Sequence, residues 1–453
     1  MGICWRGSTG TAACCARNHA RTACWCGCCL PGTWRSGCRS SSWAPWRGSR
    51  ERSGDAWTVE AAPGSGHLVT PSSGFEPPPY PYDRLDDLRR LAATHAGGVV
   101  DLSVGAPTDP PPRAVQRSLA DVSDVHTYPP SIGQEQTREA ASRWMRRRLG
   151  VEASPDDIAA CVGTKEFVVS LPRYMRLRNP ERDTVLYPEV AYPSYAMGAT
   201  LAGCRSVPVQ VDQRWRIDVA AISEQDAARA LCLWVNTPGN PAGGLDDLAE
   251  VARWGRAHGV PVFSDECYVE FTWVGPGVGE LGLPGGTIVR SGLDGVVALH
   301  SLSKRSNFAG GRFGFYVGDP EIVRYLREVR KHAGLMVPAP VQRAAVAALD
   351  DDAHVLEQRD RYRQRLSRLA EILVAMGIPA SLPEGGFYLW VRAPDGDGWS
   401  LARRFAERAG ALVSPGELYG TRGARYVRVA AVADMAALDL MAERLGPATG
   451  ICR

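Results

Sequence analysis

The chain of 453 residues offers few amines for covalent chemistry, since its lysines are Lys165, Lys304 and Lys331. A lysine can form an imine with an aldehyde, whereas an arginine cannot. Lys304 has the most informative surroundings, because Ser301 and Ser303 precede it and Arg312 follows two glycines. Hydroxyl groups and a guanidinium could hold a phosphate beside the amine. A lone lysine would suggest a solvated loop, but these neighbours favour a site for a phosphorylated aldehyde.

Two further charged residues stand beside apolar runs. Asp265 follows the apolar residues 260–263, and a helix cap or a surface carboxylate is the alternative interpretation. Arg428 lies between two valines in strand-like alternation, which is an unusual position for a solvated cation. A buried arginine needs a carboxylate. Either a substrate or an Asp or Glu of the protein could supply it.

The elements that must position these residues follow an alternating pattern. Short apolar runs end in polar or glycine-rich turns at 184–189, 230–241, 260–268, 295–304 and 311–319, with helical segments such as 245–258 between them. This alternation predicts an α/β fold, in which ligands gather at the carboxyl ends of the strands. Residues 341–377 predict two successive helices or one long one, and 385–393 and 424–432 predict strands. No internal repeat is visible, which excludes solenoids and propellers.

The N-terminal part of the chain differs from the rest in composition. Residues 1–50 hold seven arginines and no acidic residue, which leaves 45 basic and 49 acidic side chains in the remainder. Eight of the 13 cysteines lie in the first 38 residues, without the repeated paired spacing of a zinc site. Residues 1–82 are therefore predicted to be a disordered or spurious extension and a linker. The sequence has no basic stripe and no apolar run of about 18 residues, so we expect a cytoplasmic protein that binds neither nucleic acid nor a membrane. We also expect that it binds no metal.

Residues 301–314, SLSKRSNFAGGRFG, resemble the lysine segment of the class I/II aminotransferases, which are fold type I enzymes that use pyridoxal 5′-phosphate. Further matches in the same order extend over about residues 84–445. The resemblance implies an α/β fold with a large, mixed, mostly parallel sheet domain at 131–334. It also implies a smaller α+β domain made of residues 83–130 and 335–453.

The resemblance implies catalytic roles for three residues. Lys304 would bind the cofactor covalently, Asp265 would pair with its ring nitrogen, and Tyr268 would bond its ring hydroxyl. The cofactor accepts electrons well only while that nitrogen is protonated, so an anionic partner is needed. The other residues that the resemblance assigns to the cofactor are Gly163, Thr164 and Lys165 in a GTKE turn, Tyr192 stacked on the ring, Asn240, Ser301, Ser303 and Arg312. Core packing is the alternative role for Tyr192.

The resemblance also implies residues for the substrate and for a second subunit. Arg428 would bind the substrate α-carboxylate, and Gly105 would close the site. Asn240, which would bond the cofactor's ring hydroxyl together with Tyr268, would also contact the substrate. Tyr128 matches a tyrosine that reaches the cofactor of the neighbouring subunit, so a homodimer with shared active sites is expected. A second substrate carboxylate would need another cation, for which the candidates are Arg330, Lys331 and Arg305.

The implied function is the transfer of an amino group between an amino acid, with glutamate as the donor, and a 2-oxo acid or related carbonyl substrate. DLSVGAPTDP, VGTKE, SDECY and residues 329–363 are most similar to the actinobacterial N-succinyl-diaminopimelate aminotransferases. The departures from that pattern are Gly239, Ala242 in Asn-Pro-Ala-Gly, Gly311, and Gly-Gly-Phe before Tyr388. They cluster around the expected cofactor and substrate positions, which leaves the substrate open.

Two alternatives remain. A lyase, a decarboxylase or a β/γ-replacement enzyme can use the same cofactor and fold, because the surroundings of the carbanion decide its fate. A non-enzymatic regulator that binds the cofactor would need an N-terminal DNA-binding domain. Residues 1–75 show no amphipathic helix pair for such a domain, and we expect them to be dispensable.

Overall fold

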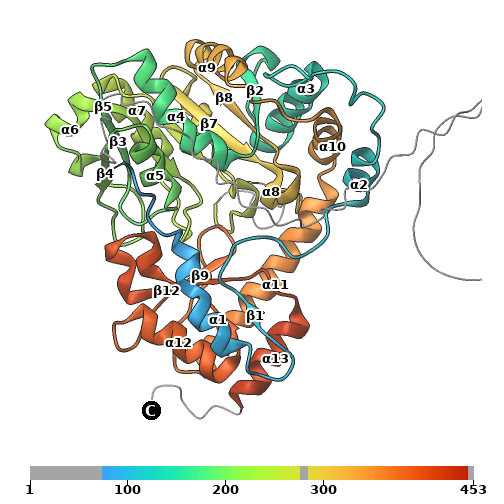
Figure 1. Ribbon diagram of the computed structural model, residues 1–453, viewed down its shortest axis with the longest axis vertical. Helices are drawn as coiled ribbons and strands as arrows, with labels where there is room; N and C mark the ends of the chain where they lie inside the picture. The colour runs from blue at the N-terminus through green and yellow to red at the C-terminus, as the bar shows by residue number, and fades with distance from the viewer. Residues whose placement is uncertain (1–73, 276–283, 447–453) are drawn as a thin grey trace, which may run out of the picture. The chain divides into compact units, whose positions relative to one another are not determined.

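The computed structural model describes residues 74–275 and 284–446, and from Glu76 onward these form one unit of mutually contacting elements (Figure 1). Most of the predicted N-terminal extension lies outside the described residues. Regular structure begins inside the predicted linker, where the 3-10 helix η1 (Pro81–Leu85) leads directly into α1 (Asp86–Ala92). The last residues of that linker therefore belong to the folded unit.

A seven-stranded sheet with the order β2-β8-β7-β6-β5-β3-β4 forms the larger part of the fold. The strands β3 to β7 run parallel, and β8 is antiparallel to both of its neighbours. The strands are β2 (Ile158–Cys161), β3 (Thr184–Pro188), β4 (Arg205–Val209), β5 (Ala230–Asn236), β6 (Val262–Asp265), β7 (Val296–Ser301) and β8 (Gly314–Gly318). This arrangement confirms the predicted large, mixed, mostly parallel sheet.

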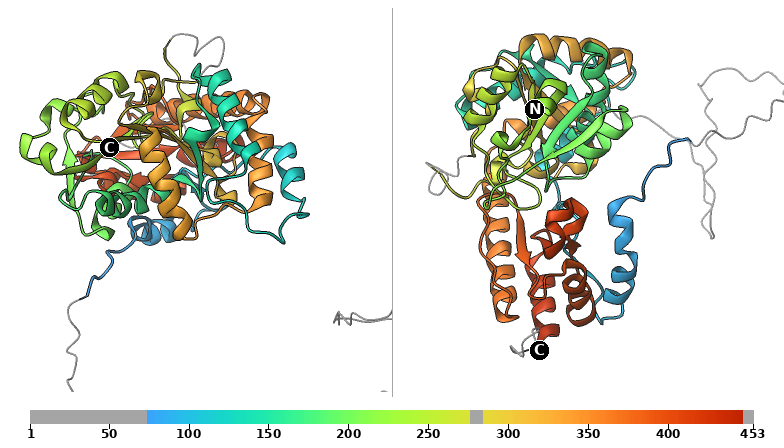
Figure 2. Two further views of the ribbon diagram at one scale, coloured as in Figure 1. Left: turned by 90° about the horizontal axis from the view of Figure 1, so that it is seen from above. Right: turned by 90° about the vertical axis from the view of Figure 1, so that its left-hand side faces the viewer.

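Helices pack on both faces of this sheet (Figure 2). Successive residues of β5 point to opposite faces, so Leu233 and Val235 enter one apolar cluster and Trp234 enters another. The helices of this part are α2 (Arg113–Leu119), α3 (Glu135–Trp144), α4 (Thr164–Arg178), α5 (Ser194–Leu201), α6 (Glu224–Arg229), α7 (Leu248–His258), α8 (Leu302–Arg305), α9 (Pro320–His332) and α10 (Ala339–Leu349). Helix α7 begins at the capping carboxylate of Asp247 and ends at the left-handed Gly259.

A second, smaller set of strands completes the unit. The three-stranded antiparallel sheet has the order β11 (Ser414–Pro415), β12 (Tyr426–Ala430) and β9 (Tyr388–Arg392), and β1 (Val100–Asp101) pairs in parallel with β10 (Ala411–Leu412). The helices α11 (Ala353–Ala375), α12 (Gly398–Ala409) and α13 (Met435–Leu445) surround these strands (Figure 1). Residues 341–377 thus contain most of α10 and all of the longer α11, which are two successive helices. The predicted domain boundaries at 131 and 335 stay a prediction.

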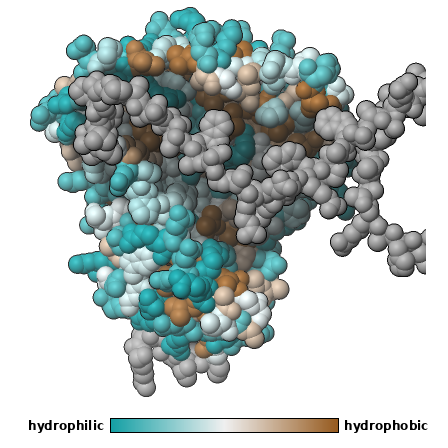
Figure 3. Space-filling model, in the orientation of Figure 1, coloured by the Kyte–Doolittle hydropathy of each residue, from teal (hydrophilic) through white to brown (hydrophobic). Residues whose placement is uncertain are grey.

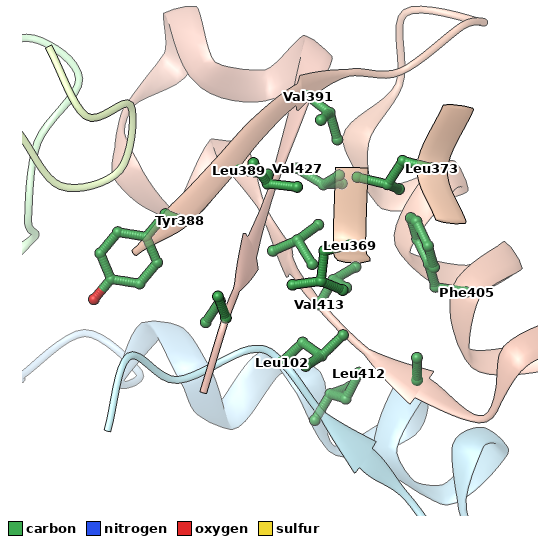
Figure 4. Close-up of a cluster of buried hydrophobic side chains, with 14 of the residues drawn as sticks. Leu102, Leu369, Leu373, Tyr388, Leu389, Val391, Phe405, Leu412, Val413 and Val427 are labelled. Carbon is green, nitrogen blue, oxygen red and sulfur yellow. The ribbon is translucent and has the colours of Figure 1, made fainter. Parts of the chain in front are cut away.

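The core of this smaller part joins strands and helices that are distant in sequence (Figure 4). Leu389 and Val391 on β9 pack with Leu369 and Leu373 of α11. Tyr388 lies at the edge of the same cluster, with its hydroxyl pointing away from it (Figure 4). The core therefore presents the polar end of Tyr388 to the rest of the molecule.

Hydrophilic side chains cover most of the face in Figure 3, with apolar side chains gathered in patches between them. Such a mixture is usual on folded proteins. Within residues 74–275 and 284–446, no helix is both long enough and apolar enough to span a bilayer.

Candidate active site

A cavity of about 200 Å³ lies at the carboxyl ends of four neighbouring parallel strands, β3, β5, β6 and β7. Each of these strands, or the loop after it, contributes side chains, as expected for an open α/β sheet. The predicted residues that line the cavity are Gly105, Thr164, Lys165, Tyr192, Asn240, Asp265, Tyr268, Ser301, Ser303, Lys304, Arg312 and Arg428. The fold thus brings together residues from both ends of the folded unit.

Lys304 lies on the short helix α8, directly after β7, and its Nζ donates to the carbonyl oxygen of Gly105. Burial lowers the pKa of this amine to about 8, and the nearby positive charges of Arg428 and Arg312 act in the same direction. A much larger share of such an amine is uncharged at neutral pH than of an ordinary lysine. Lys304 can therefore act as a nucleophile and as a base.

Asp265 ends β6 at the floor of the cavity and is 5% exposed. It accepts hydrogen bonds from the Tyr195 hydroxyl at 3.0 Å and from the Cys267 backbone at 3.3 Å. Among the described residues, no Lys, Arg or His forms an ion pair with it, and burial raises its pKa. A buried carboxylate without a cation fits a ligand that brings a positive charge, such as a protonated ring nitrogen.

A cradle for an anion lies at the opposite end of the cavity. Arg312 adopts a left-handed backbone (φ 55°) and forms no ion pair with any described Asp or Glu. A Cβ on Gly163 would lie 2.3 Å from the Arg312 guanidinium, so only glycine lets the guanidinium reach the N-terminus of α4. The hydroxyls of Ser301 and Ser303 face the same cavity. Helix N-termini, hydroxyls and a guanidinium together suit a phosphate group.

Arg428 lies on β12, is 1% exposed, and faces the cavity without a carboxylate partner. Its guanidinium donates to the Asn240 side-chain oxygen at 2.7 Å and to the Ser103 carbonyl oxygen. The ring of Tyr388 lies 4.2 Å from the guanidinium carbon. A structural ion pair, which the sequence left open, is absent among the described residues. Asn240 therefore orients the guanidinium, which remains available for a ligand carboxylate.

The tyrosines of the cavity include residues that sequence reasoning missed. Tyr268 lies at the predicted place, where its hydroxyl pairs with that of Tyr388 at 2.7 Å. Tyr195 was not predicted, although it stands three residues after Tyr192 and could have been sought at that helical spacing. Tyr80 and Tyr82 also line the cavity. They lie in the proline-rich segment interpreted as a linker, where no periodicity signals a buried role.

Four predicted residues lie elsewhere. Tyr128 is 92% exposed between α2 and α3, and its contact with a second subunit stays a prediction. Arg330 forms a bidentate ion pair with Glu166 at 2.7 and 2.9 Å. Arg305 pairs with Glu270 and Asp352, and the exposed Lys331 lies near Glu328. The expectation that one of these three cations serves a substrate carboxylate is therefore wrong, because none lines the cavity and each has an acidic neighbour.

The structure gives packing reasons for two departures from the family pattern. A Cβ at Gly311 would lie 2.2 Å from the Phe308 ring, so Phe308 occupies the space that a side chain at 311 would need. A Cβ at Gly385 would lie 2.5 Å from Pro238, and its backbone N–H donates to the Gly243 carbonyl at 3.0 Å. In the described part of the chain no cluster of three or more His, Cys, Asp or Glu could hold a metal ion.

Comparison with known proteins places these residues in a family context. The profile described as aminotransferase class I and II matches residues 97–445. The 4-dedimethylamino-4-oxo-anhydrotetracycline transaminase of Streptomyces rimosus is 40% identical over 373 residues, which cover 82% of this chain and 99% of that protein. A probable aminotransferase of Mycobacterium tuberculosis is 41% identical over 360 residues, covering 79% and 82%.

A solved structure shares the fold as well. The probable N-succinyldiaminopimelate aminotransferase from Thermus thermophilus has a TM-score of 0.71 and 30% identity, over 80% of this chain and 98% of that one. These relatives carry different substrate names or none. The matches therefore do not single out the N-succinyl-diaminopimelate enzymes within the family.

Proposed function

Because the chain belongs to the aminotransferase class I and II family, we propose that this aminotransferase moves an amino group from glutamate to a 2-oxo acid or related carbonyl substrate. The observation that carries the proposal is that one cavity holds two basic groups that form no ion pair with a described residue. The amine of Lys304 has a lowered pKa, and the buried guanidinium of Arg428 lacks an acidic partner. Together they suit a ligand with a reactive carbonyl and a substrate with a carboxylate.

Pyridoxal 5′-phosphate, the cofactor of this family, supplies an aldehyde for the amine and a ring that draws electrons from the substrate α-carbon. In our proposal, Lys304 binds the aldehyde and Asp265 faces the ring nitrogen. The phosphate site consists of Arg312 and the N-terminus of α4. The remaining residues proposed at the cofactor site as a whole are Gly163, Thr164, Lys165, Tyr192, Asn240, Tyr268, Ser301 and Ser303. Two observations support this fit: the buried carboxylate of Asp265 forms no ion pair with a described residue, and the Arg312 guanidinium closely approaches Gly163 at the N-terminus of α4.

Arg428 holds the substrate by donating a bidentate pair of hydrogen bonds to its α-carboxylate. With the carboxylate fixed there, the α C–H bond rather than the C–CO₂ bond faces Lys304. Lys304 Nζ would take the proton from the α-carbon and donate one to the cofactor carbon that carried the aldehyde, which suits an amine with a pKa of about 8. This division of roles favours amino transfer over decarboxylation.

Lys165 supports glutamate as the donor, because a dicarboxylic substrate needs a second cation. It lines the cavity, its Nζ donates to the Tyr80 hydroxyl at 3.2 Å, and it forms no ion pair with a described Asp or Glu. Lys165 therefore replaces the three cations that sequence reasoning considered. In our proposal its ammonium group binds the distal carboxylate of the donor, while its backbone, in the first turn of α4, belongs to the phosphate site.

Two acceptors are compatible with this site. The similarity to a probable N-succinyldiaminopimelate aminotransferase favours an acyclic 2-oxo acid derivative. The similarity to a transaminase of an oxo-anhydrotetracycline favours a ketone on a ring system, for which a wall containing Tyr80, Tyr82 and Tyr192 is suited. We also propose a homodimer, in which the exposed Tyr128 reaches the neighbouring site.

A single turnover tests the proposed reaction. Enzyme loaded with cofactor and given ¹⁵N-glutamate without an acceptor should release one equivalent of 2-oxoglutarate and no carbon dioxide. The label should appear in the second product once an acceptor is added. Release of carbon dioxide or of a side-chain fragment would instead indicate a decarboxylase, lyase or replacement enzyme.

The donor subsite is tested with a matched pair of lysine variants. Lys165→Met should weaken glutamate binding about tenfold more than alanine binding, because only glutamate has a distal carboxylate. Lys331→Met, at an exposed position of α9, should change neither. Equal effects of Lys165→Met on both amino acids would contradict the subsite.

A further inference from the structure

The position of Lys304 depends on a chain segment from the other part of the fold. Lys304 Nζ donates to the carbonyl oxygen of Gly105, in the segment that follows β1. A Cβ on Gly105 would lie 1.8 Å from the Tyr388 hydroxyl, so the backbone there is pressed against that ring. The same segment is bound two residues earlier, where the Ser103 carbonyl accepts from Arg428 and from Ser414. These contacts of Ser103 and Gly105 thus fix the position of the Gly105 carbonyl, which accepts from Lys304.

A second set of contacts holds the other end of this segment. The Asp109 carboxylate accepts a bidentate pair from Arg365 at 2.7 and 2.8 Å. It also accepts from Gln358 Nε2 at 2.9 Å. Gln358 and Arg365 are seven residues apart on α11, which is two helical turns, so both side chains leave the same face of the helix. They are 1% and 5% exposed, which makes this a buried network.

The side-chain amide of Gln358 also reaches the loop that carries Lys304. Its Oε1 accepts from Asn307 Nδ2 at 3.0 Å, and Asn307 lies three residues after Lys304. Asn307 has a left-handed backbone with φ 50°, which few residues other than glycine and asparagine adopt easily. One amide therefore donates to the Gly105 segment and accepts from the Lys304 loop. A glutamate in its place would lose the donor and set a second negative charge against Asp109.

We propose that Gln358 is a positioning residue that joins the Gly105 segment to the Lys304 loop and so keeps the lysine amine enclosed beneath the Gly105 carbonyl. Its partner Asp109 lies four residues after Gly105, and its partner Asn307 lies three residues after Lys304. A motion of α11 is then transmitted to both segments together. This role of Gln358 is the same whichever substrate the enzyme uses.

The environment of the Lys304 amine can be read directly in the full chain after removal of the cofactor. Competitive labelling with isotopic acetic anhydride across a pH series gives the pKa of each lysine by mass spectrometry. Lys331, which is exposed, serves as the internal reference. In the wild-type chain Lys304 should titrate near 8, as burial requires.

Two variants break the network at different points. Gln358→Met removes the hydrogen bonds of its amide with Asp109, Asn307 and Arg361 at nearly constant volume. Asn307→Gly removes the side-chain bonds to Gln358 and to the Pro110 carbonyl oxygen while keeping the left-handed backbone. Each should admit water to the amine, so the pKa of Lys304 should rise toward its ordinary value of 10.5. Arg368 lies on the same helix α11, and Arg368→Met, which removes its partly exposed ion pairs with Asp439 of α13 and with Glu371, should leave the value near 8.

The outcomes separate positioning from a general loss of structure. A rise in both network variants, with unfolding temperatures close to that of Arg368→Met, supports the proposal. An unchanged Lys304 in either folded variant overturns it, as does an equal rise in Arg368→Met. If Gln358→Met does not fold, Asn307→Gly decides, because it alters only a half-buried loop side chain.

Discussion

Buried charges without partners characterise this site at the scale of single residues. Asp265 and Arg428 are each nearly inaccessible, and neither forms an ion pair with a described residue. Leaving a charge in this state costs free energy unless a ligand completes it. By contrast, Arg330 and Arg305 are equally buried but have carboxylate partners. The pairing of a charge, rather than its burial, distinguishes residues that bind ligands from those that stabilise the fold.

The three lysines allow a direct test of covalent attachment. Lys304→Ala should still bind pyridoxal phosphate through the phosphate cradle but should lose the covalent bond, because the amine that contacts the Gly105 carbonyl is gone. Lys331→Ala should retain it. Borohydride reduction followed by peptide mass mapping measures the attachment, and a label on Lys165 or Lys331 in the wild-type protein would refute the assignment of Lys304.

Arg428→Ala should weaken the binding of amino acids and leave cofactor binding intact. Loss of a charge-assisted bidentate pair costs a few kcal/mol, so affinity should fall by about two orders of magnitude. Titration of the cofactor absorbance with amino acids measures this. Arg422→Ala, which removes a partly exposed ion pair with Glu189, is the control and should bind normally. Equal affinities of the two variants would move the carboxylate site elsewhere.

Residue types near strand ends were predictable, but their partners were not. Lys304, Asp265 and Arg428 could be selected because chemistry-bearing groups are rare beside apolar runs. Arg330 could not be excluded as a substrate ligand, since its partner Glu166 is distant in sequence. Tyr195 was missed for the same reason, because its hydrogen bond to Asp265 forms only in the folded chain.

At the scale of elements, the parallel strands collect the site at one edge of the sheet. Strands β3, β5, β6, β7 and β8 were predictable as continuous apolar runs, which strands buried on both faces require. Strand β4 was not, because it lies at the edge of the sheet and most of its side chains are exposed. Strand β2 is short and carried no distinct signal. The missing strands flank the site, so its location was predictable without them.

The junction between β2 and α4 gives a prediction at this scale. Gly163→Ala should weaken cofactor binding by about tenfold or more, because the new Cβ would displace the Arg312 guanidinium from the helix terminus. Gly98→Ala is a matched control, since Gly98 also has a positive φ but open space around it. Titration of each variant with pyridoxal phosphate measures the difference. Similar losses in both would attribute the effect to backbone strain alone.

At the scale of the molecule, the cavity joins an N-terminal segment, the large sheet and the C-terminal strands. The Tyr82 hydroxyl lies 3.1 Å from that of Tyr419, and Tyr80 accepts from Lys165. The fold class was predictable because the family resemblance spans most of the patterned chain. The place of Tyr80 and Tyr82 was not, since a proline-rich segment has the same composition whether it is solvated or packed.

Two truncations distinguish the residues before Glu76 from the segment that contains Tyr80 and Tyr82. A chain that begins at Glu76 should bind the cofactor normally, because the residues that line the cavity all lie after Glu76. A chain that begins at Arg84 lacks Tyr80 and Tyr82 and should bind amino acids more weakly. Titrations of both chains measure the effect. Normal binding by the shorter chain would show that the two tyrosines are not part of the site.

The pairing of β1 with β10 also affects the order in which the chain can fold while it is being synthesised. All seven strands of the large sheet, together with Lys304 and Arg312, lie before residue 319, so a nascent chain can form the cofactor cradle early. Val100 and Asp101 must then wait for Ala411 and Leu412 to leave the ribosome before their strand is paired. Arg428 follows later still. In our proposal, the nascent chain therefore acquires the residues that hold the cofactor before the residue that binds the substrate carboxylate.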